Sequence, residues 1–395
     1  MKKFLILLLS LNFFLACTEE DRGQYPLDSV APGKISSVSV TNHPGGALIS
    51  YAIPGDDDLL YVKALYKLDD GTPMEQKASA YVTQIEIEGL GLAKNQTIQL
   101  ISGDRSQNES DPVNVEISPL ESPIYDILNS IVLKADFGGV YLSWNNPLKS
   151  EIVLSVSVME NNNQFTEIQN IYSKASVGKF NIRGFSVEER VFAVFIRDRW
   201  MNKTDVVSQA LTPLYEEQLD NTQFARWNPQ GIPYIELPNW GWTIEKIWDG
   251  QLSYASAGYS FPGTVVLPHS FTMDLGQIAQ LGRVKLFQRA TGDQLYTGGN
   301  IKKFQLWGSA TPDVNADFST WTLLGDFESI KPSGSATGIK TQEDIDYATA
   351  GEDYTIENST VPVRYLRFHI EKTWGGSPAM QLFEAEFYGK VQMKN

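Results

Sequence analysis

The sequence lacks the residues on which most catalytic and metal-binding motifs depend. It contains one cysteine and three histidines in 395 residues. The histidines, His43, His269 and His369, stand far apart and show no metal-binding spacing such as HExxH. A serine nucleophile elbow and a glycine-rich phosphate loop are also missing. The sequence therefore predicts that the protein is not an enzyme. A glycosidase carboxylate pair stays open, because the distance between two carboxylates cannot be read from a sequence.

The longest apolar run is too short to cross a membrane. It extends from Phe4 to Leu15 and includes Ser10 and Asn12, whereas a membrane-spanning helix needs about 20 apolar residues. Two lysines precede the run, which is the layout of a secretory signal. We therefore predict a signal peptide over residues 1–16 and not a membrane-spanning anchor.

The single cysteine directly follows this segment. The sequence LAC at residues 15–17 resembles a bacterial lipobox, which implies that Cys17 is diacylated and anchors the protein to a membrane. The alternative is a plain secretory signal with an unused cysteine. Residues 17–33 are polar, as expected for a tether. Their acidic cluster after Cys17 resembles the surface-export signal of Bacteroidota lipoproteins, which implies an outer-membrane protein facing the cell exterior, with the periplasmic face as the alternative.

Basic residues are scarce relative to acidic ones. The chain has 32 Lys and Arg against 47 Asp and Glu, a formal net charge of −15. This balance excludes a nucleic-acid partner, because binding to phosphate backbones depends on clustered basic side chains. Aromatic residues, in contrast, make up 11% of the chain and include nine tryptophans. The composition therefore favours a neutral ligand.

The chain contains an internal repeat. GGALISYAIP is followed 93 residues later by GGVYLSWNNP, so that the Gly-Gly pairs and the aromatic residues Tyr51 and Trp144 correspond. Further on, Asp104-Arg105 corresponds to Asp198-Arg199. Short alternating strands separated by turn residues predict two tandem β-sandwiches, over residues 34–121 and 122–215. Both copies resemble fibronectin type III or immunoglobulin-like modules, in which Tyr51 and Trp144 would be core residues.

The last part of the chain, residues 222–395, has different landmarks. In order, these are WDG, DLG, IKKF leading into WGS, RYLRF and a closing AEFYG. Their order resembles the discoidin domain, also called the coagulation-factor C-type domain, which is a galactose-binding-like β jelly roll. The expected fold class is therefore all-β, with two tandem β-sandwiches followed by a discoidin-like jelly roll. The whole arrangement resembles Bacteroidota surface lipoproteins encoded among polysaccharide-utilisation genes. That resemblance implies glycan binding near an outer-membrane transporter partner.

The discoidin resemblance also implies a structural Ca²⁺ site. In carbohydrate-binding members, the ion is held by the loop around the WDG turn and by a glutamate on the last strand. Asp249 and Glu384 match these positions, while Gln251 replaces a usual acidic or amide residue and removes charge. The alternative is that Asp249 caps its own turn and that Glu384 faces solvent.

A sugar site needs flat aromatic rings and planar polar groups at loops. In RYLRFHI, the apolar residues are expected to face the core, and Arg367 and His369 are expected to face water. The loop after this strand carries Trp374 beside two glycines, which we interpret as room for a ligand to approach. The predicted ligand-binding residues are Trp374, Tyr296, Trp242, Tyr254, Arg289 and His269, with Trp240, Tyr259 and Asp293 as weaker candidates.

Three functions are compatible with these features. The first is a surface glycan-binding lipoprotein in which the sandwiches act as spacers. The second is an adhesion module that grips a protein partner, which a broad apolar patch would favour over single exposed aromatics. The third is a structural subunit of an outer-membrane assembly, which inward-packed loop aromatics would favour.

Overall fold

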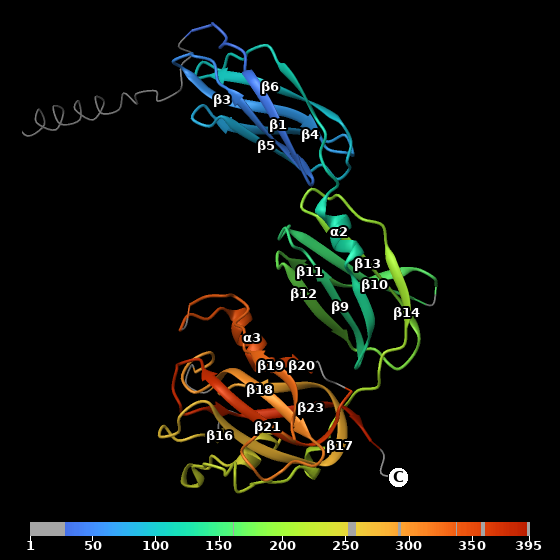
Figure 1. Ribbon diagram of the computed structural model, residues 1–395, viewed down its shortest axis with the longest axis vertical. Helices are drawn as coiled ribbons and strands as arrows, with labels where there is room; N and C mark the ends of the chain where they lie inside the picture. The colour runs from blue at the N-terminus through green and yellow to red at the C-terminus, as the bar shows by residue number, and fades with distance from the viewer. Residues whose placement is uncertain are drawn as a thin grey trace, which may run out of the picture. The chain divides into compact units, whose positions relative to one another are not determined.

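The structure is a computed structural model that describes residues 28–160, 162–251, 258–290, 294–336, 338–356 and 360–392. The predicted signal peptide and Cys17 lie outside the described residues. The all-β prediction is confirmed, with two small β-sandwich domains followed by a larger β-sheet domain (Figure 1). Within the described ranges, no helix is both long enough and apolar enough to span a bilayer. The chain divides into two compact units: unit 1 is Met1–Ile131, Trp144–Gly178 and Ala193–Ser208, and unit 2 is Val132–Ser143, Lys179–Phe192 and Gln209–Asn395.

The first sandwich consists of two antiparallel sheets, with strand orders β1-β2-β5 and β4-β3-β6-β7. Strand β5 (Gln84–Glu88) shows the alternation expected of a half-buried strand. Ile87 on this strand packs in one core with Ile49, Val62 and Ile98 from both sheets, and all four are 0% exposed. The other strands are β1 (Ser36–His43), β2 (Gly46–Ala52), β3 (Leu59–Lys67), β4 (Pro73–Ser79), β6 (Gln96–Asp104) and β7 (Val113–Ile117).

The repeated Gly-Gly pair has the same physical cause in both copies. Gly45 and Gly138 have φ values of +76° and +64°, in the left-handed region that glycine adopts most easily. The second glycine of each pair lies against a neighbouring strand. A Cβ on Gly46 would be 1.9 Å from the carbonyl oxygen of Ile87, and a Cβ on Gly139 would be 1.8 Å from the corresponding oxygen in the second copy. In each pair, the first glycine therefore forms the turn, and the second lets its strand approach the neighbouring strand closely.

The second sandwich begins with the short helix α2 (Pro123–Asn129) and contains sheets of order β11-β10-β13-β14 and β12-β9-β8. Trp144 and Tyr51 are 4% and 5% exposed, which confirms their predicted role in the cores. The Trp144 ring fills the space beside Gly178, where a Cβ would lie 2.0 Å from the ring. The strands are β8 (Val132–Asp136), β9 (Gly139–Asn145), β10 (Ile152–Met159), β11 (Phe165–Ser173), β12 (Val177–Arg183), β13 (Arg190–Asp198) and β14 (Val207–Leu211).

The larger domain is built on a seven-stranded sheet of order β15-β23-β17-β21-β18-β19, with β20 paired to β17. The long strand β17 (His269–Phe287) pairs with β20, β21 and β23. Phe271 and Phe368 stack in the core with ring centroids 4.8 Å apart. The remaining elements are β15 (Glu217–Gln218), η2 (Asn221–Gln223), η3 (Pro238–Trp240), η4 (Ile244–Ile247), β16 (Tyr259–Ser260), β18 (Ile301–Ser309), β19 (Thr322–Glu328), α3 (Gln342–Ala350), β20 (Glu352–Thr355), β21 (Pro362–Thr373), β22 (Gln381–Leu382) and β23 (Glu384–Val391).

Strand β21 confirms only half of its predicted alternation. The three apolar side chains of RYLRFHI are 0% exposed, as expected. The prediction that Arg367 faces water is wrong, because it is 4% exposed. Its guanidinium lies 3.7 Å from the ring centroid of Phe318 and donates hydrogen bonds of 2.8 and 2.9 Å to carbonyl oxygens of the loop that carries Phe318. This loop covers the outer face of the sheet, so His369 is half-buried as well.

Candidate ligand-binding site

Trp374 directly follows β21 and is held by three side chains. Its ring meets that of Tyr296 edge-on, with centroids 5.2 Å apart and an interplanar angle of 83°. The indole N–H donates a hydrogen bond of 3.0 Å to the hydroxyl oxygen of Ser329. The ammonium of Lys302 lies 4.7 Å from the ring centroid, within cation–π range. Trp374 itself remains partly exposed. The ring is therefore fixed in orientation while part of its surface faces solvent.

The two glycines after Trp374 are explained by contact with another loop. The N–H of Trp374 donates to the carbonyl of Asn300, and the N–H of Gly375 donates to the carbonyl of Gly298, both at 2.8 Å. A Cβ on Gly375 would lie 2.7 Å from the backbone nitrogen of Gly298. Gly376 has a φ of +69°, in the left-handed region that glycine adopts most easily. The glycines thus allow two loops to pack together, which corrects the interpretation that they leave room for a ligand.

The same neighbouring loop connects Trp374 to two other predicted site residues. The side-chain amide of Asn300 accepts a hydrogen bond of 2.7 Å from the Arg289 N–H and donates one of 3.1 Å to the Arg289 carbonyl. The Arg289 guanidinium lies 5.1 Å from the ring centroid of Trp242. Asn300, which is 1% exposed, therefore joins the backbones of Arg289 and Trp374, and the Arg289 side chain extends to Trp242. Sequence reasoning missed Asn300, because one asparagine after two glycines carries no distinctive pattern.

Not all predicted aromatics are accessible. Tyr296 is 0% exposed, so the prediction that it contacts a ligand is wrong in this structure. The loop-like sequence around it folds inward, and Tyr296 supports the Trp374 ring instead. Tyr259 is also 0% exposed and belongs to the main core, whereas Trp240 is 74% exposed on η3. Tyr254 and Asp293 lie outside the described residues.

His269 contacts strand β21 and Phe261, and none of its contacts described below involves Trp374. It opens β17, pairs with Ile370 on β21, and its ring meets that of Phe261 edge-on at 4.8 Å. Burial lowers the pKa of His269, and the neighbouring His369 adds to this effect. His269 is therefore neutral at neutral pH and contacts core residues, while its predicted role in ligand binding stays a prediction.

A buried polar network behind the Trp374 ring also escaped the sequence analysis. Ser329, which is 2% exposed, accepts the indole N–H of Trp374 and a hydrogen bond of 3.3 Å from the Gln288 amide. Gln288 also donates to the Glu352 carboxyl, to which the Tyr354 hydroxyl donates at 2.7 Å. Burial raises the pKa of Glu352, and its hydrogen bonds oppose that shift. Because the indole N–H can only donate, this network determines the orientation of the Trp374 ring.

The two predicted calcium ligands are electrostatic neighbours. Glu384 on β23 is 3% exposed, and its Oε2 atom has no hydrogen-bond partner within the described residues. Burial and the charge of Asp249 raise the pKa of Glu384 to about 8. Asp249 accepts a hydrogen bond of 2.9 Å from the Gln251 N–H and forms an ion pair of 2.8 Å with Lys246. Asp249 thus caps its own turn, but the alternative that Glu384 faces solvent is wrong. Two adjacent carboxylates, one with a free buried oxygen, fit a hard cation.

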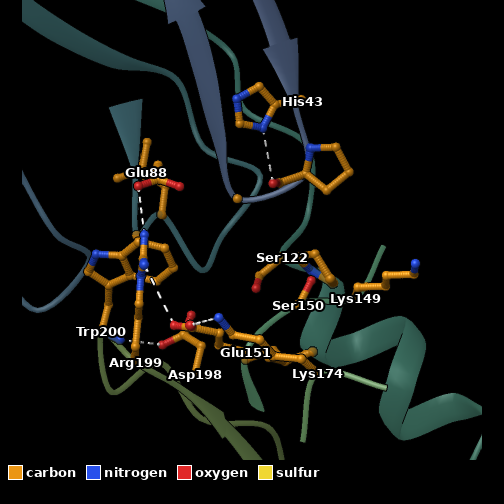
Figure 2. A pocket seen from close by; sticks show the side chains of 16 residues that line it. His43, Glu88, Ser122, Lys149, Ser150, Glu151, Lys174, Asp198, Arg199 and Trp200 are labelled. Atoms are coloured by element: carbon orange, nitrogen blue, oxygen red, sulfur yellow. Dashed lines mark hydrogen bonds and ion pairs between the residues drawn. The ribbon is translucent and has the colours of Figure 1, made fainter. Parts of the chain in front are cut away.

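Unit 1 contains a cavity of about 320 Å³ that sequence reasoning did not anticipate (Figure 2). Its wall includes Arg199, whose guanidinium lies 4.1 Å from the ring centroid of Trp200 and donates to Glu88 at 2.7 Å. The lining comes from turns that are far apart in the sequence, which is why no local pattern revealed it. The charged side chains around the cavity are Glu88, Glu151, Asp198, Lys149, Lys174 and Arg199.

The architecture defines a modular all-β protein with two small sandwiches and a larger β-sheet domain. Among solved structures, the chain is 34% identical to the SusE-like protein BT2857 over 67% of this chain and 98% of that chain, with a TM-score of 0.44. Because this sequence identity extends over nearly all of that protein, the chain belongs to the SusE-like family.

Three family models match successive parts of the chain, and each is described as a domain of unknown function. They are DUF4959 at residues 32–119, DUF5126 at residues 120–222 and DUF5000 at residues 248–389. None of the curated protein sequences matches the chain.

More distant likenesses occur among solved structures. A two-domain fibronectin type III segment of chicken tenascin shows 15% identity over 46% of this chain and 99% of that chain, with a TM-score of 0.22. The C-terminal domain of a chitobiase from Bacteroides fragilis shows 16% identity over 45% of this chain and 95% of that chain, with a TM-score of 0.27. Likenesses at this level carry no functional conclusion.

Proposed function

We propose that this SusE-like protein is a cell-surface lipoprotein that binds carbohydrate through its C-terminal domain and supports glycan capture for uptake. The observation that carries the proposal is the partly exposed Trp374 ring, fixed by Ser329 and Tyr296 and accompanied by the Lys302 ammonium. Membership in the SusE-like family and the discoidin-like order of sequence landmarks support the same conclusion.

The chemistry of the Trp374 group suits a sugar. A pyranose presents an apolar C–H face that packs on a flat ring and an edge of hydroxyls that needs hydrogen-bond partners. Lys302 stands at the ring with three N–H donors on a flexible chain, so it can follow a hydroxyl of the stacked sugar. A preformed orientation of the Trp374 ring reduces the ordering cost of binding.

Arg289 and Trp242 extend this surface. Arg289 has a planar guanidinium whose parallel N–H groups can donate to two adjacent hydroxyls. Its position above the Trp242 ring and its backbone bonds to Asn300 hold it beside the Trp374 loop. The proposed binding surface therefore comprises Trp374, Lys302, Arg289 and Trp242.

Calcium has a structural role in this proposal. Asp249 and Glu384 would hold the ion. The Oε2 atom of Glu384, which has no hydrogen-bond partner within the described residues, would then have the cation as its partner. Binding would require Glu384 to lose its proton and Lys246 to leave Asp249. The ion would connect the WDG loop to β23 and stabilise the domain.

The rest of the chain positions the binding domain. Cys17 provides the lipid anchor in the outer membrane, and the protein faces the cell exterior. The modules at 34–121 and 122–215 act as spacers for the domain at 222–395. An outer-membrane transporter is the proposed protein partner. Binding and not catalysis is the proposed activity, because the groups at the C-terminal site are aromatic rings and cationic hydrogen-bond donors.

The test is binding of residues 18–395 to a panel of soluble polysaccharides, compared among Trp374→Ala, Trp374→Phe and the control Tyr81→Ala. Tyr81 is 91% exposed and belongs to the first sandwich, so its removal controls for loss of a surface aromatic ring. We expect Trp374→Ala to weaken binding at least tenfold and Trp374→Phe to retain most of it. Equal binding by all four proteins would refute the Trp374 surface. The absence of any glycan binding would shift the function to a protein-binding adhesion module or a structural subunit.

A further inference from the structure

One wall of the unit 1 cavity is held by close packing and side-chain hydrogen bonds. A Cβ on Gly89 would lie 2.8 Å from the Trp200 ring, so the indole rests directly on the backbone there. The side-chain amide of Asn202 donates to the Gly89 carbonyl at 2.9 Å and to Asp198 at 2.8 Å. Asp198 also accepts the Trp200 N–H at 2.9 Å. These bonds fix the turn that carries Arg199, so the groups around the cavity are preorganised.

Charged side chains in the wall alternate between hydrogen-bond acceptors and donors. Arg199 lies 2.7 Å from Glu88 and 3.6 Å from Glu151, and Glu151 also pairs with Lys174. In Figure 2, dashed lines join Arg199 to Glu88 and to Glu151, and Glu151 to Lys174. The side chains of Arg199, Glu88 and Glu151 are 49%, 44% and 41% exposed, so solvent reaches them. A ligand can therefore meet both donors and acceptors.

The charges around the cavity argue for a neutral ligand. Three acidic side chains, Glu88, Glu151 and Asp198, are balanced by three basic ones, Lys149, Lys174 and Arg199. An anion would meet the three carboxylates, and a metal cation would meet the three basic groups. Hydroxyl groups both donate and accept, so a neutral polyhydroxyl compound uses this mixture best. The volume of about 320 Å³ is at the small end of the roughly 300–1,000 Å³ range of small-molecule sites.

An adjoining hollow provides an aromatic surface. This hollow, of about 460 Å³, shares Glu151, Lys174, Asp198 and Arg199 with the cavity and also contains Tyr172. Tyr172 on the edge strand β11 is 74% exposed, although a tyrosine ring is largely apolar. In a short oligosaccharide, one sugar residue can occupy the cavity while the next sugar residue packs on the Tyr172 ring.

We propose that the unit 1 cavity, together with the Tyr172 hollow, is a second binding site that accepts a short segment of a neutral oligosaccharide. The choice of a saccharide rests on the carbohydrate-binding function proposed above, and the site is separate from the Trp374 surface. Arg199 donates to hydroxyls in the cavity, Glu88 and Glu151 accept from them, and Tyr172 packs on the apolar face of the next sugar.

The experiment measures binding of residues 18–395 to starch, xylan, galactomannan and laminarin, with polygalacturonate as the anionic comparison, by affinity electrophoresis. Tyr172→Ala removes the exposed ring, and Ser150→Trp fills the cavity without altering a charge. Tyr81→Ala is the matched control, because Tyr81 is 91% exposed and lies outside both hollows. Each substitution is made in the parent and in the Trp374→Ala chain, and thermal unfolding confirms that each variant folds.

We expect the Trp374→Ala chain to retain some binding of a neutral polysaccharide. In that chain, Tyr172→Ala and Ser150→Trp should each weaken the remaining binding at least fivefold, and Tyr81→Ala should leave it unchanged. Loss of all binding in Trp374→Ala alone would overturn the second site and leave the proposed function intact. Binding lost only through Tyr172→Ala and Ser150→Trp would support the second site and overturn the Trp374 surface. Binding of polygalacturonate alone, or of no polymer, would overturn the second site.

Discussion

The close approach of Gly46 to the neighbouring strand gives a sharp stability prediction. In the Gly46→Ala variant the new Cβ would begin 1.9 Å from the carbonyl oxygen of Ile87, and real Cβ atoms essentially never lie within 3.0 Å of such an atom. Strands β2 and β5 would therefore have to separate by at least about 1.1 Å at this point. Gly46 pairs with Glu88, so the separation weakens the hydrogen-bonded ladder between them.

The magnitude follows from two contributions. Overpacking of a dense interior costs about 1–3 kcal/mol, and each weakened hydrogen bond adds about 1 kcal/mol. The free energy of unfolding of the first sandwich should therefore fall by about 3 kcal/mol. For a domain of roughly 90 residues this lowers the unfolding temperature by about 12 to 24 °C.

The assay is differential scanning calorimetry of residues 18–395. Gly55→Ala is the matched control, because a Cβ there would meet nothing within 4 Å in the same sandwich. The control should unfold within about 2 to 4 °C of the parent, as expected for an exposed site. Equal unfolding temperatures for Gly46→Ala and Gly55→Ala would refute the idea that close backbone approach accounts for the second glycine of the repeated pair.

Three further predictions concern the larger domain. Ca²⁺ should raise the unfolding temperature of the parent by several degrees and that of Glu384→Gln by less than one degree. Equal shifts in the two proteins would show that Ca²⁺ does not bind at Glu384. Burial lowers the pKa of His369, so the neutral ring stabilises the fold above about pH 6.5 and this stability is lost as the pH falls below that value. His369→Gln should therefore lose less stability than the parent between pH 7 and 5 in urea titrations, and a parallel loss would contradict this. Gly375→Ala should weaken carbohydrate binding severalfold by separating the two loops, and unchanged affinity would argue that loop contact does not position Trp374.

The local features of the fold were predictable because they depend on short-range chemistry. The Gly-Gly repeat marked two equivalent turns, and the apolar positions of β21 alternated as a half-buried strand requires. The failure at Arg367 has a different origin. The loop that carries Phe318 is distant from β21 in the sequence and covers the outer face of the sheet. The alternation of residues in β21 contains no sign of this contact.

The candidate sites were less predictable, because they are assembled from segments that are distant in the sequence. Trp374 was found from its local context, but its supports at Ser329 and Asn300 come from other strands and loops. Tyr296 has the sequence context of an exposed loop, yet it packs inward against Trp374. The cavity around Arg199 could not have been predicted, since its lining combines turns and element ends from separate parts of the chain.

The most direct test of the central claim observes the Trp374 ring itself. In a chain with ¹⁵N-labelled indoles, the Nε1–H signal of Trp374 is assigned by its loss in Trp374→Phe and followed during titration with the polysaccharide that binds best. A sugar that packs on this ring should shift the Trp374 signal in a saturable way and leave the signal of Trp144, a core residue of the second sandwich, in place. A Trp374 signal that stays unchanged at saturating polysaccharide would contradict the proposed carbohydrate surface.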